Sequence, residues 1–396
     1  MSNNQTNVKA NIWKYYVFEV LWPSNLFLPI FQVFMLARNI TITQMAIIGI
    51  VWTIAYLGTE VPSGVLADRW GRKKTLFLSQ SLLIISTIIT IFAQTIWIFM
   101  ISSIFSGFWL ACYSGTGVAF FYDSLVELKN EKDYEKLWGR MGFITIPVHF
   151  LFATFSSLLF LINSILPYIL TIILAFLSLF VILSFVEPKY HKTSIEHSIF
   201  LHFKESIKKV LKNDYIAFIV LFGAILGFAL EYLSNNIQLY LTLIKVHIAL
   251  FGVIFAFGSL IEGIGRISAN RIKKIFDYRI ILTFTLSAAV VSIIGLSFLN
   301  NYYGVILYAL IFFISGLFRI IQRGYIHKRV ESYNRATVDS VSTFIMTILV
   351  ILLSPIAGVL ADLYSIRLAF LLVGCVLAIY GVYYFSSRFN KKHLFE

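Results

Sequence analysis

The stretch GVLADRWGRKK, from Gly64 to Lys74, interrupts an otherwise strongly apolar sequence. It places five charged residues and two glycines within eleven positions, whereas only 13% of the whole chain is charged. Apolar segments of more than twenty residues lie on both sides of it. A short basic turn between two such segments is typical of a loop that returns the chain into a membrane. The stretch therefore predicts two membrane helices joined by a tight charged turn.

The composition of the whole chain agrees with this interpretation. Hydrophobic residues make up 59% of it, and 38 of the 396 residues are Phe. An apolar run of about 20 residues is needed to cross roughly 30 Å of hydrocarbon as a helix. Twelve such runs lie near residues 12–37, 44–66, 75–95, 96–120, 141–162, 165–187, 215–240, 247–269, 279–299, 302–322, 336–361 and 366–386. The sequence predicts an all-α polytopic membrane protein with 12 transmembrane helices.

The net charge of +13 is a signal of topology. Most of the 32 Lys and Arg residues fall in the two terminal segments, the central linker and the loops on the same side of the predicted membrane. Only Arg38, Lys245 and Arg367 fall in loops on the other side. Basic loops stay in the cytoplasm, so we expect a multi-pass protein of the plasma (inner) membrane with both termini cytoplasmic. The partner of this charge is the lipid bilayer, and no nucleic-acid partner is expected.

The longest polar stretch divides the chain into two halves of six spans. We predict an N-terminal six-helix bundle over 1–187, a cytoplasmic linker over 188–214 and a C-terminal six-helix bundle over 215–396. The end of the linker has apolar residues on one helical face and lysines opposite. This pattern is typical of an amphipathic helix on the membrane surface, and a solvated linker helix explains it equally well.

The two halves also resemble each other in sequence. A shift of 202 residues places Glu60 on Glu262 and Asp68 on Asn270, and a shift of 209 places SGFW at Ser106 on SGLF at Ser315. The matches fall at equivalent positions in the two sets of spans. Parallel repeats of this kind are a common plan of secondary transporters.

The charged turn resembles the signature loop of the major facilitator superfamily. The pattern Gly, any residue, Leu, Ala, Asp, Arg, any residue, Gly, Arg, Lys, Lys is matched at every key position, and the loop joins the second and third spans as in that family. The resemblance covers the whole chain through the plan of six plus six spans. It implies a two-bundle fold and transport by alternating access, and it assigns a gating role to Gly64, Asp68, Arg69, Gly71, Arg72 and Lys73.

Physical reasons for several of these residue types are independent of the resemblance. Gly64 is suited to a close approach between helices, and Gly71 to the tight return into the third span. Asp68 can accept hydrogen bonds at the positive end of a helix. In the family that helix is the eleventh, which implies that Asp68 latches the two halves together on the cytoplasmic side. A turn that only fixes topology would account for the basic residues but not for Asp68.

Acidic residues inside the spans are candidates for coupling transport to protons. Burying a carboxylate in a membrane is costly, so such a residue carries a proton, pairs with a cation or faces water. Polar residues at helical spacing around Glu231 predict a stripe that, by the resemblance, faces the pathway. The alternative for each acid is a hydrogen bond between helices. The coupling candidates are Glu231, Glu19, Arg319 as a counter-charge, Glu60 and Glu262.

Aromatic and polar residues on the spans that line the cavity in this family are candidates for contact with a substrate. Their rings can stack on an amphiphilic or cationic molecule, although most aromatic residues in such a chain pack against lipid or other helices. The substrate-cavity candidates are Trp22, Trp109, Tyr113, Phe228, Tyr232, Asn235, Gln238 and Phe318.

These features favour a monomeric secondary transporter, with proton-coupled efflux of small amphiphilic, drug-like compounds as the first hypothesis. Proton-coupled uptake of a nutrient or metabolite is the alternative. The fourth span lacks the arginine, and the fifth the Gly-Pro-rich pattern, that many members carry, so coupling and direction stay open. A membrane-embedded enzyme or a transporter-like sensor is disfavoured, because neither a catalytic cluster nor a large soluble segment is present. No cofactor or metal is expected.

Overall fold

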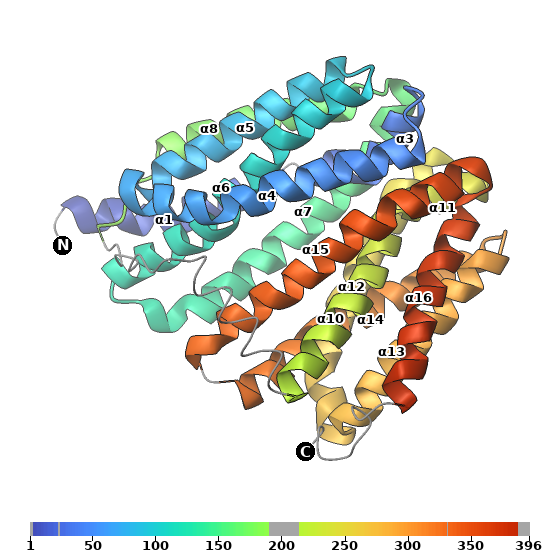
Figure 1. The fold of residues 1–396 in the computed structure, drawn as a ribbon. Coiled ribbons are helices and arrows are strands. Elements are labelled where there is room, and N and C mark those ends of the chain that lie inside the picture. Colours follow the sequence, from blue (N-terminus) through green and yellow to red (C-terminus); the bar gives the residue numbers. More distant parts are fainter. Residues whose placement is uncertain (1–2, 23, 190–213, 331, 387–396) are drawn as a thin grey trace. The chain divides into compact units, whose positions relative to one another are not determined.

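The computed structural model describes residues 3–22, 24–189, 214–330 and 332–386, and within these ranges the chain is helical with no strand (Figure 1). The all-α prediction is confirmed. The chain divides into two compact units. The first comprises Met1–Ile40, Ile47–Ile195 and His247–Ala256, and the second comprises Thr41–Ala46, Glu196–Val246 and Phe257–Glu396. The predicted amphipathic helix of the linker lies outside the described residues.

The first six predicted spans appear as a series of helices coloured blue to green in Figure 1. A short 3-10 turn, η2 (Glu131–Asp133), precedes the fifth of them. The helices are α1 (Asn3–Val20), α2 (Ser24–Phe27), the 3-10 turn η1 (Leu28–Ile30), α3 (Phe31–Leu36), α4 (Ile42–Trp70), α5 (Arg72–Phe92), α6 (Ile96–Glu127), α7 (Tyr134–Ile162) and α8 (Leu166–Leu183).

The last six predicted spans form a second series, coloured yellow-green to red. The helices are α10 (Asp214–Asn235), α11 (Ile237–Leu243), the 3-10 turn η3 (Ile248–Leu250), α12 (Phe251–Ile275), α13 (Tyr278–Phe298), α14 (Tyr303–Arg329), α15 (Ser332–Leu363) and α16 (Ile366–Ser386).

Eleven of the described helices are long and apolar enough to cross a membrane, one fewer than predicted. The missing one is the first span, which the sequence predicted as a continuous helix over 12–37. It is broken after Val20 and again at the 3-10 turn that contains Pro29. Proline has no backbone N–H to donate and disrupts a regular helix, which explains the second break.

The seventh span is also broken, at Asn236. The side chain of Asn236 donates to the carbonyl of Tyr232 at 2.7 Å, and α11 begins at the next residue. Asparagine competes in this way with the backbone bonds that continue a helix. The predicted polar stripe around Glu231 therefore ends at Asn235, and Gln238 lies on a separate short helix.

The internal repeat is visible in how equivalent helices pack. Within the first unit α5 packs against α6 and α8, and within the second unit α13 packs in the same way against α14 and α16. The aligned glycines of the SGFW and SGLF stretches play the same role. A Cβ atom on Gly107 would lie 2.9 Å from the carbonyl oxygen of Trp52 in α4, and one on Gly316 would lie 2.0 Å from that of Glu262 in α12. Each glycine permits a close contact between two helix backbones.

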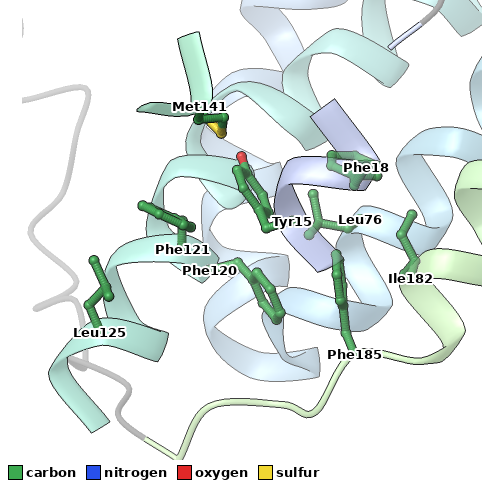
Figure 2. Packing of buried hydrophobic residues seen from close by; sticks show 9 residues of the cluster. All are labelled: Tyr15, Phe18, Leu76, Phe120, Phe121, Leu125, Met141, Ile182 and Phe185. Atoms are coloured by element: carbon green, nitrogen blue, oxygen red, sulfur yellow. The ribbon is translucent and has the colours of Figure 1, made fainter. Parts of the chain in front are cut away.

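A cluster of nine buried residues from α1, α5, α6, α7, α8 and the segment after α8 holds the first unit together. Figure 2 shows the rings of Tyr15, Phe120 and Phe185 at its centre. The rings of Phe120 and Phe185 lie 4.5 Å apart, and those of Tyr15 and Phe121 lie 5.2 Å apart. Helices in lipid associate mainly through such close packing, and aromatic pairs of this kind contribute about 0.5–1.5 kcal/mol each. The cluster fixes α1 against α6 one turn from Glu19.

The turn between α4 and α5 depends on Gly71. Its backbone has φ 101° and ψ 152°, a combination that is almost restricted to glycine. A Cβ atom at this position would also lie 2.9 Å from the carboxyl carbon of Glu187. A Cβ atom on Gly64, by contrast, would meet no described atom within 4 Å. The close helix approach that we predicted for Gly64 therefore stays a prediction, whereas the tight return at Gly71 matches its backbone conformation.

Replacing Gly71 by alanine is expected to destabilise the protein by roughly 1–3 kcal/mol, because the side chain forces a strained backbone and pushes against Glu187. The matched control is Gly64→Ala, which adds the same methyl group where there is room. Thermal unfolding of the two purified variants in detergent measures the difference. Equal melting temperatures would show that the turn relaxes without cost.

Candidate functional site

The charged turn that opens the sequence is organised around Arg72. One guanidinium nitrogen of Arg72 lies 2.9 Å from a carboxylate oxygen of Asp68, and its Nε lies 3.4 Å from Asp123. Asp123, near the end of α6, is only 7% exposed. A largely buried arginine between two carboxylates links the end of α4, the start of α5 and the end of α6.

A third carboxylate, from the segment after α8, also binds to the same turn. Glu187, just after α8, accepts hydrogen bonds from the backbone nitrogens of Arg72 at 2.5 Å and Lys73 at 2.8 Å. The Lys73 ammonium in turn donates to the carbonyls of Leu183 and Phe185. Glu187 thus caps the positive N-terminal end of α5. The sequence analysis missed this residue, although the acid that directly precedes Pro188 at the end of a span was a usable signal.

The remaining motif residues occupy the surface of the first unit. Arg69 is exposed at the end of α4, and Asp68 is partly buried. The latch between Asp68 and the second half of the chain stays a prediction.

The second constellation lies around Glu19, near the end of α1. The Tyr113 hydroxyl of α6 donates to the Glu19 carboxylate at 2.6 Å. His149 of α7 contacts the backbone carbonyl oxygen of Glu19 at 2.9 Å, and the carbonyl is the acceptor. Three helices of the first unit therefore meet at this acid, as the packing of α1 with both α6 and α7 also shows.

Aromatic rings surround one side of this carboxyl group. The Trp22 ring lies 4.0 Å from that of Tyr113 and is stacked at 5.0 Å on that of Trp109. Trp109 is buried, and its indole N–H has no hydrogen-bond acceptor among the described residues. The structure thus brings together four of the predicted residues. Glu19 lies at the end of α1, Trp22 follows that helix, and Trp109 and Tyr113 lie in α6.

The polar content of this cluster is unusual for a membrane interior. In the described part of the chain no Lys, Arg or His side chain forms an ion pair with the Glu19 carboxylate, which accepts its hydrogen bond from a neutral tyrosine hydroxyl. An uncompensated carboxylate is costly there, and protonation removes the cost. Chemically, the cluster can bind and release a proton next to a flat aromatic surface.

The second unit contains a chain of charges on α12 and α14. Glu262 pairs with Arg266 one turn along α12, and its carboxylate also lies 3.8 Å from Arg319 of α14. Arg319 acts electrostatically on Glu231 of α10 as well. The Glu231 side chain is exposed. Arg319 thus lies close to one of the predicted acids, and its role as a counter-charge in coupling stays a prediction.

The other predicted residues are more dispersed. Glu60 is exposed on α4 and accepts only a long hydrogen bond, 3.3 Å, from Tyr56. Asn235 is exposed at the end of α10. The other four candidates of the second unit are buried in this conformation and pack within that unit: Phe228, Tyr232, Gln238 and Phe318.

Comparison with known proteins agrees with this architecture. The family model of the Major Facilitator Superfamily matches residues 20–348. An uncharacterized MFS-type transporter, YxaM of Bacillus subtilis strain 168, is 25% identical over 249 residues, and the match spans 59% of either chain.

Solved structures share the fold across almost the entire chain. A mutant form of the nucleoside transporter NupG superposes with a TM-score of 0.79 at 13% identity over 97% of this chain and 99% of its own. A bacterial homologue of the human lysosomal transporter Spinster gives 0.73 at 12% identity, over 100% and 99% of the two chains. With the family match over residues 20–348, this chain belongs to the major facilitator superfamily and is a multi-pass membrane transporter.

Proposed function

We propose that this transporter takes up a small polar metabolite with a flat ring, of the nucleoside type, together with protons. The observation that carries the proposal is the cluster of Glu19, Tyr113, Trp22 and Trp109 in the first unit. It combines a proton-binding group with an aromatic binding surface within a few ångströms.

Glu19 is better suited to carry the coupled proton than Glu231, which the sequence favoured. Glu231 is exposed, and the cation Arg319 is near enough to act on it electrostatically. Glu19 has no such partner among the described residues, so its charge depends on whether water or substrate reaches it. Alternating access exposes such a group to one side of the membrane at a time.

The aromatic residues indicate the shape of the substrate. Trp22 and Tyr113 offer ring faces for stacking, and base–aromatic stacking is worth about 1–3 kcal/mol per base in other proteins. The Trp109 indole N–H lacks an acceptor, and a carbonyl or ring nitrogen of a substrate would supply one. A hydroxyl group of the substrate would donate to the Glu19 carboxylate.

The comparisons favour uptake of a metabolite over the drug efflux that the sequence suggested first. The superposed NupG structures are those of a nucleoside transporter. At 13% identity this likeness shows the fold, and it supports the substrate class only in combination with the aromatic site. The location in the plasma membrane, the cytoplasmic termini and the Asp68 latch are parts of the same proposal.

The proposal is tested with purified protein in liposomes. The interior is made alkaline relative to the outside, and accumulation of radiolabelled uridine, adenosine, sugars and amino acids is measured. In parallel, dissipation of a proton gradient by lipophilic cations tests efflux. Proton-driven accumulation of a ring-bearing metabolite supports the proposal, whereas a response to lipophilic cations alone would favour efflux.

Glu19→Gln is expected to reduce proton-driven accumulation roughly tenfold or more, because glutamine cannot exchange a proton and weakens the bond from Tyr113. Exchange of labelled for unlabelled substrate without a gradient should persist, since glutamine resembles the protonated acid. The matched control is Glu60→Gln, an exposed acid of the same unit with one long hydrogen bond. A Glu19→Gln variant that still concentrates substrate would remove Glu19 from the coupling step.

Asp68→Asn is expected to slow transport roughly tenfold, because it removes the ion pair with Arg72 and the charge of the proposed latch. Expression and membrane insertion should be close to normal. The control is Asp133→Asn, which removes an acid from the short turn before α7. Initial rates of uptake at equal protein amounts in liposomes give the measurement, and a normal rate for Asp68→Asn would exclude the latch.

A further inference from the structure

The end of the second unit at which α12, α13 and α14 meet carries a cluster of cations around one aromatic ring. The ammonium groups of Lys273 and Lys328 lie 5.3 and 5.5 Å from the centre of the Tyr278 ring, and the Arg329 guanidinium lies 5.8 Å from it. Arg329 also lies 4.1 Å from the ring of Tyr325. We refer to Lys273, Tyr278, Lys328 and Arg329 as the basic cluster. No part of the proposed transport function uses it.

The basic cluster contains buried hydrogen-bond donors without acceptors. Tyr278 is 6% exposed, and its hydroxyl has no hydrogen-bond partner among the described residues. One terminal guanidinium nitrogen of Arg329 is buried and also lacks a partner there. Unsatisfied buried donors cost free energy, so their presence in a native structure points to an acceptor that binds there.

Two polar groups of the basic cluster pack closely against Gly324 of α14. The Lys273 ammonium lies 3.1 Å and the Tyr278 hydroxyl 3.3 Å from the place that a Cβ atom would occupy on Gly324. Two donors from different helices therefore converge over a backbone that has no side chain. The N-terminus of α13 adds the positive end of a helix dipole, and the side chain of Asp277 at its cap position makes no hydrogen bond to the first turn.

The turn between α4 and α5 in the first unit corresponds to the turn between α12 and α13, and the two differ in their acidic residues. In the first unit the cation Arg72 lies between Asp68 and Asp123, and Glu187 caps the N-terminus of α5. In the second unit the residue aligned with Asp68 is Asn270, which carries no charge. Among the described residues, no carboxylate forms an ion pair with a cation of the basic cluster. The position of Asp68 is therefore occupied by an uncharged side chain in the second unit.

We propose that the basic cluster binds the phosphate group of an anionic phospholipid. A phosphodiester supplies several acceptor oxygens for the converging donors and the negative charge that the cluster lacks. The neighbouring surfaces of the same helices suit its acyl chains, because Ile267 of α12 and Ile280 and Phe284 of α13 are exposed apolar side chains. Basic sites between membrane helices at the cytoplasmic side favour anionic head groups. With the termini in the cytoplasm, as proposed above, this lipid belongs to the inner leaflet.

The test uses the purified full-length chain and native mass spectrometry. The protein is titrated with phosphatidylglycerol or with phosphatidylcholine, and bound lipid is counted. The variant carries Lys273→Gln, Lys328→Gln and Arg329→Gln. The matched control carries Lys129→Gln, Lys132→Gln and Lys136→Gln, three exposed lysines near η2 of the first unit. Both variants lose the same charge.

Wild type and control are expected to retain phosphatidylglycerol in preference to phosphatidylcholine. A surface cation contributes about fivefold to the affinity for an anionic lipid, so the triple variant should lose roughly a hundredfold. Equal retention by wild type and triple variant would overturn the proposal. An equal loss in variant and control would also overturn it, because it would indicate unspecific attraction.

A second variant and a second ligand separate the remaining explanations. Tyr278→Phe removes only the buried hydroxyl, and it should weaken retention of phosphatidylglycerol roughly tenfold even if the triple variant fails to fold. Inorganic phosphate at millimolar concentration should leave the melting temperature unchanged, whereas phosphatidylglycerol should raise it. Protection by inorganic phosphate equal to that by the lipid would assign the site to free phosphate and exclude the lipid.

Discussion

The first unit depends on the burial of one cation. Arg72 is largely withdrawn from solvent, and Asp68 and Asp123 supply the charges that make this possible. Removing one partner of a buried ion pair typically costs about 3–5 kcal/mol, because the other charge is left uncompensated. Glu187 adds a second tie to the same turn. The ends of α4, α6 and α8 are therefore fixed to the start of α5, and the aromatic cluster behind them holds α1 and the Glu19 site.

Much of this architecture could be predicted from the sequence. The length of the apolar runs predicted eleven of the spans, and the residue types of the charged turn predicted the tight return at Gly71. The helix breaks after Val20 and at Asn236 were not predicted. Hydropathy measures the apolar content of a segment and does not show where its backbone hydrogen bonds are interrupted. The cap by Glu187 joins residues more than a hundred positions apart, and although the acid before Pro188 stands out in the sequence, a single sequence does not show which helix it caps.

The two units share a plan but differ in how they balance charge. The first compensates its buried base with Asp68 and Asp123, whereas Glu19 has no cation partner among the described residues. The second compensates Glu262 with two arginines and leaves the cations around Tyr278 without a protein carboxylate among the described residues. The two units therefore differ at these charged positions, while each has a glycine, Gly107 or Gly316, at a close contact between helix backbones.

The broken first span has a consequence for biosynthesis. Its helix ends leave backbone carbonyls that need donors, and α7 provides them. Ser156 donates to the carbonyl of Leu26, and His149 contacts that of Glu19. Unsatisfied carbonyls are costly in hydrocarbon, so this segment reaches its final form only after residues more than a hundred positions later have been inserted. The order in which the helices mature therefore differs from the order in which they are made.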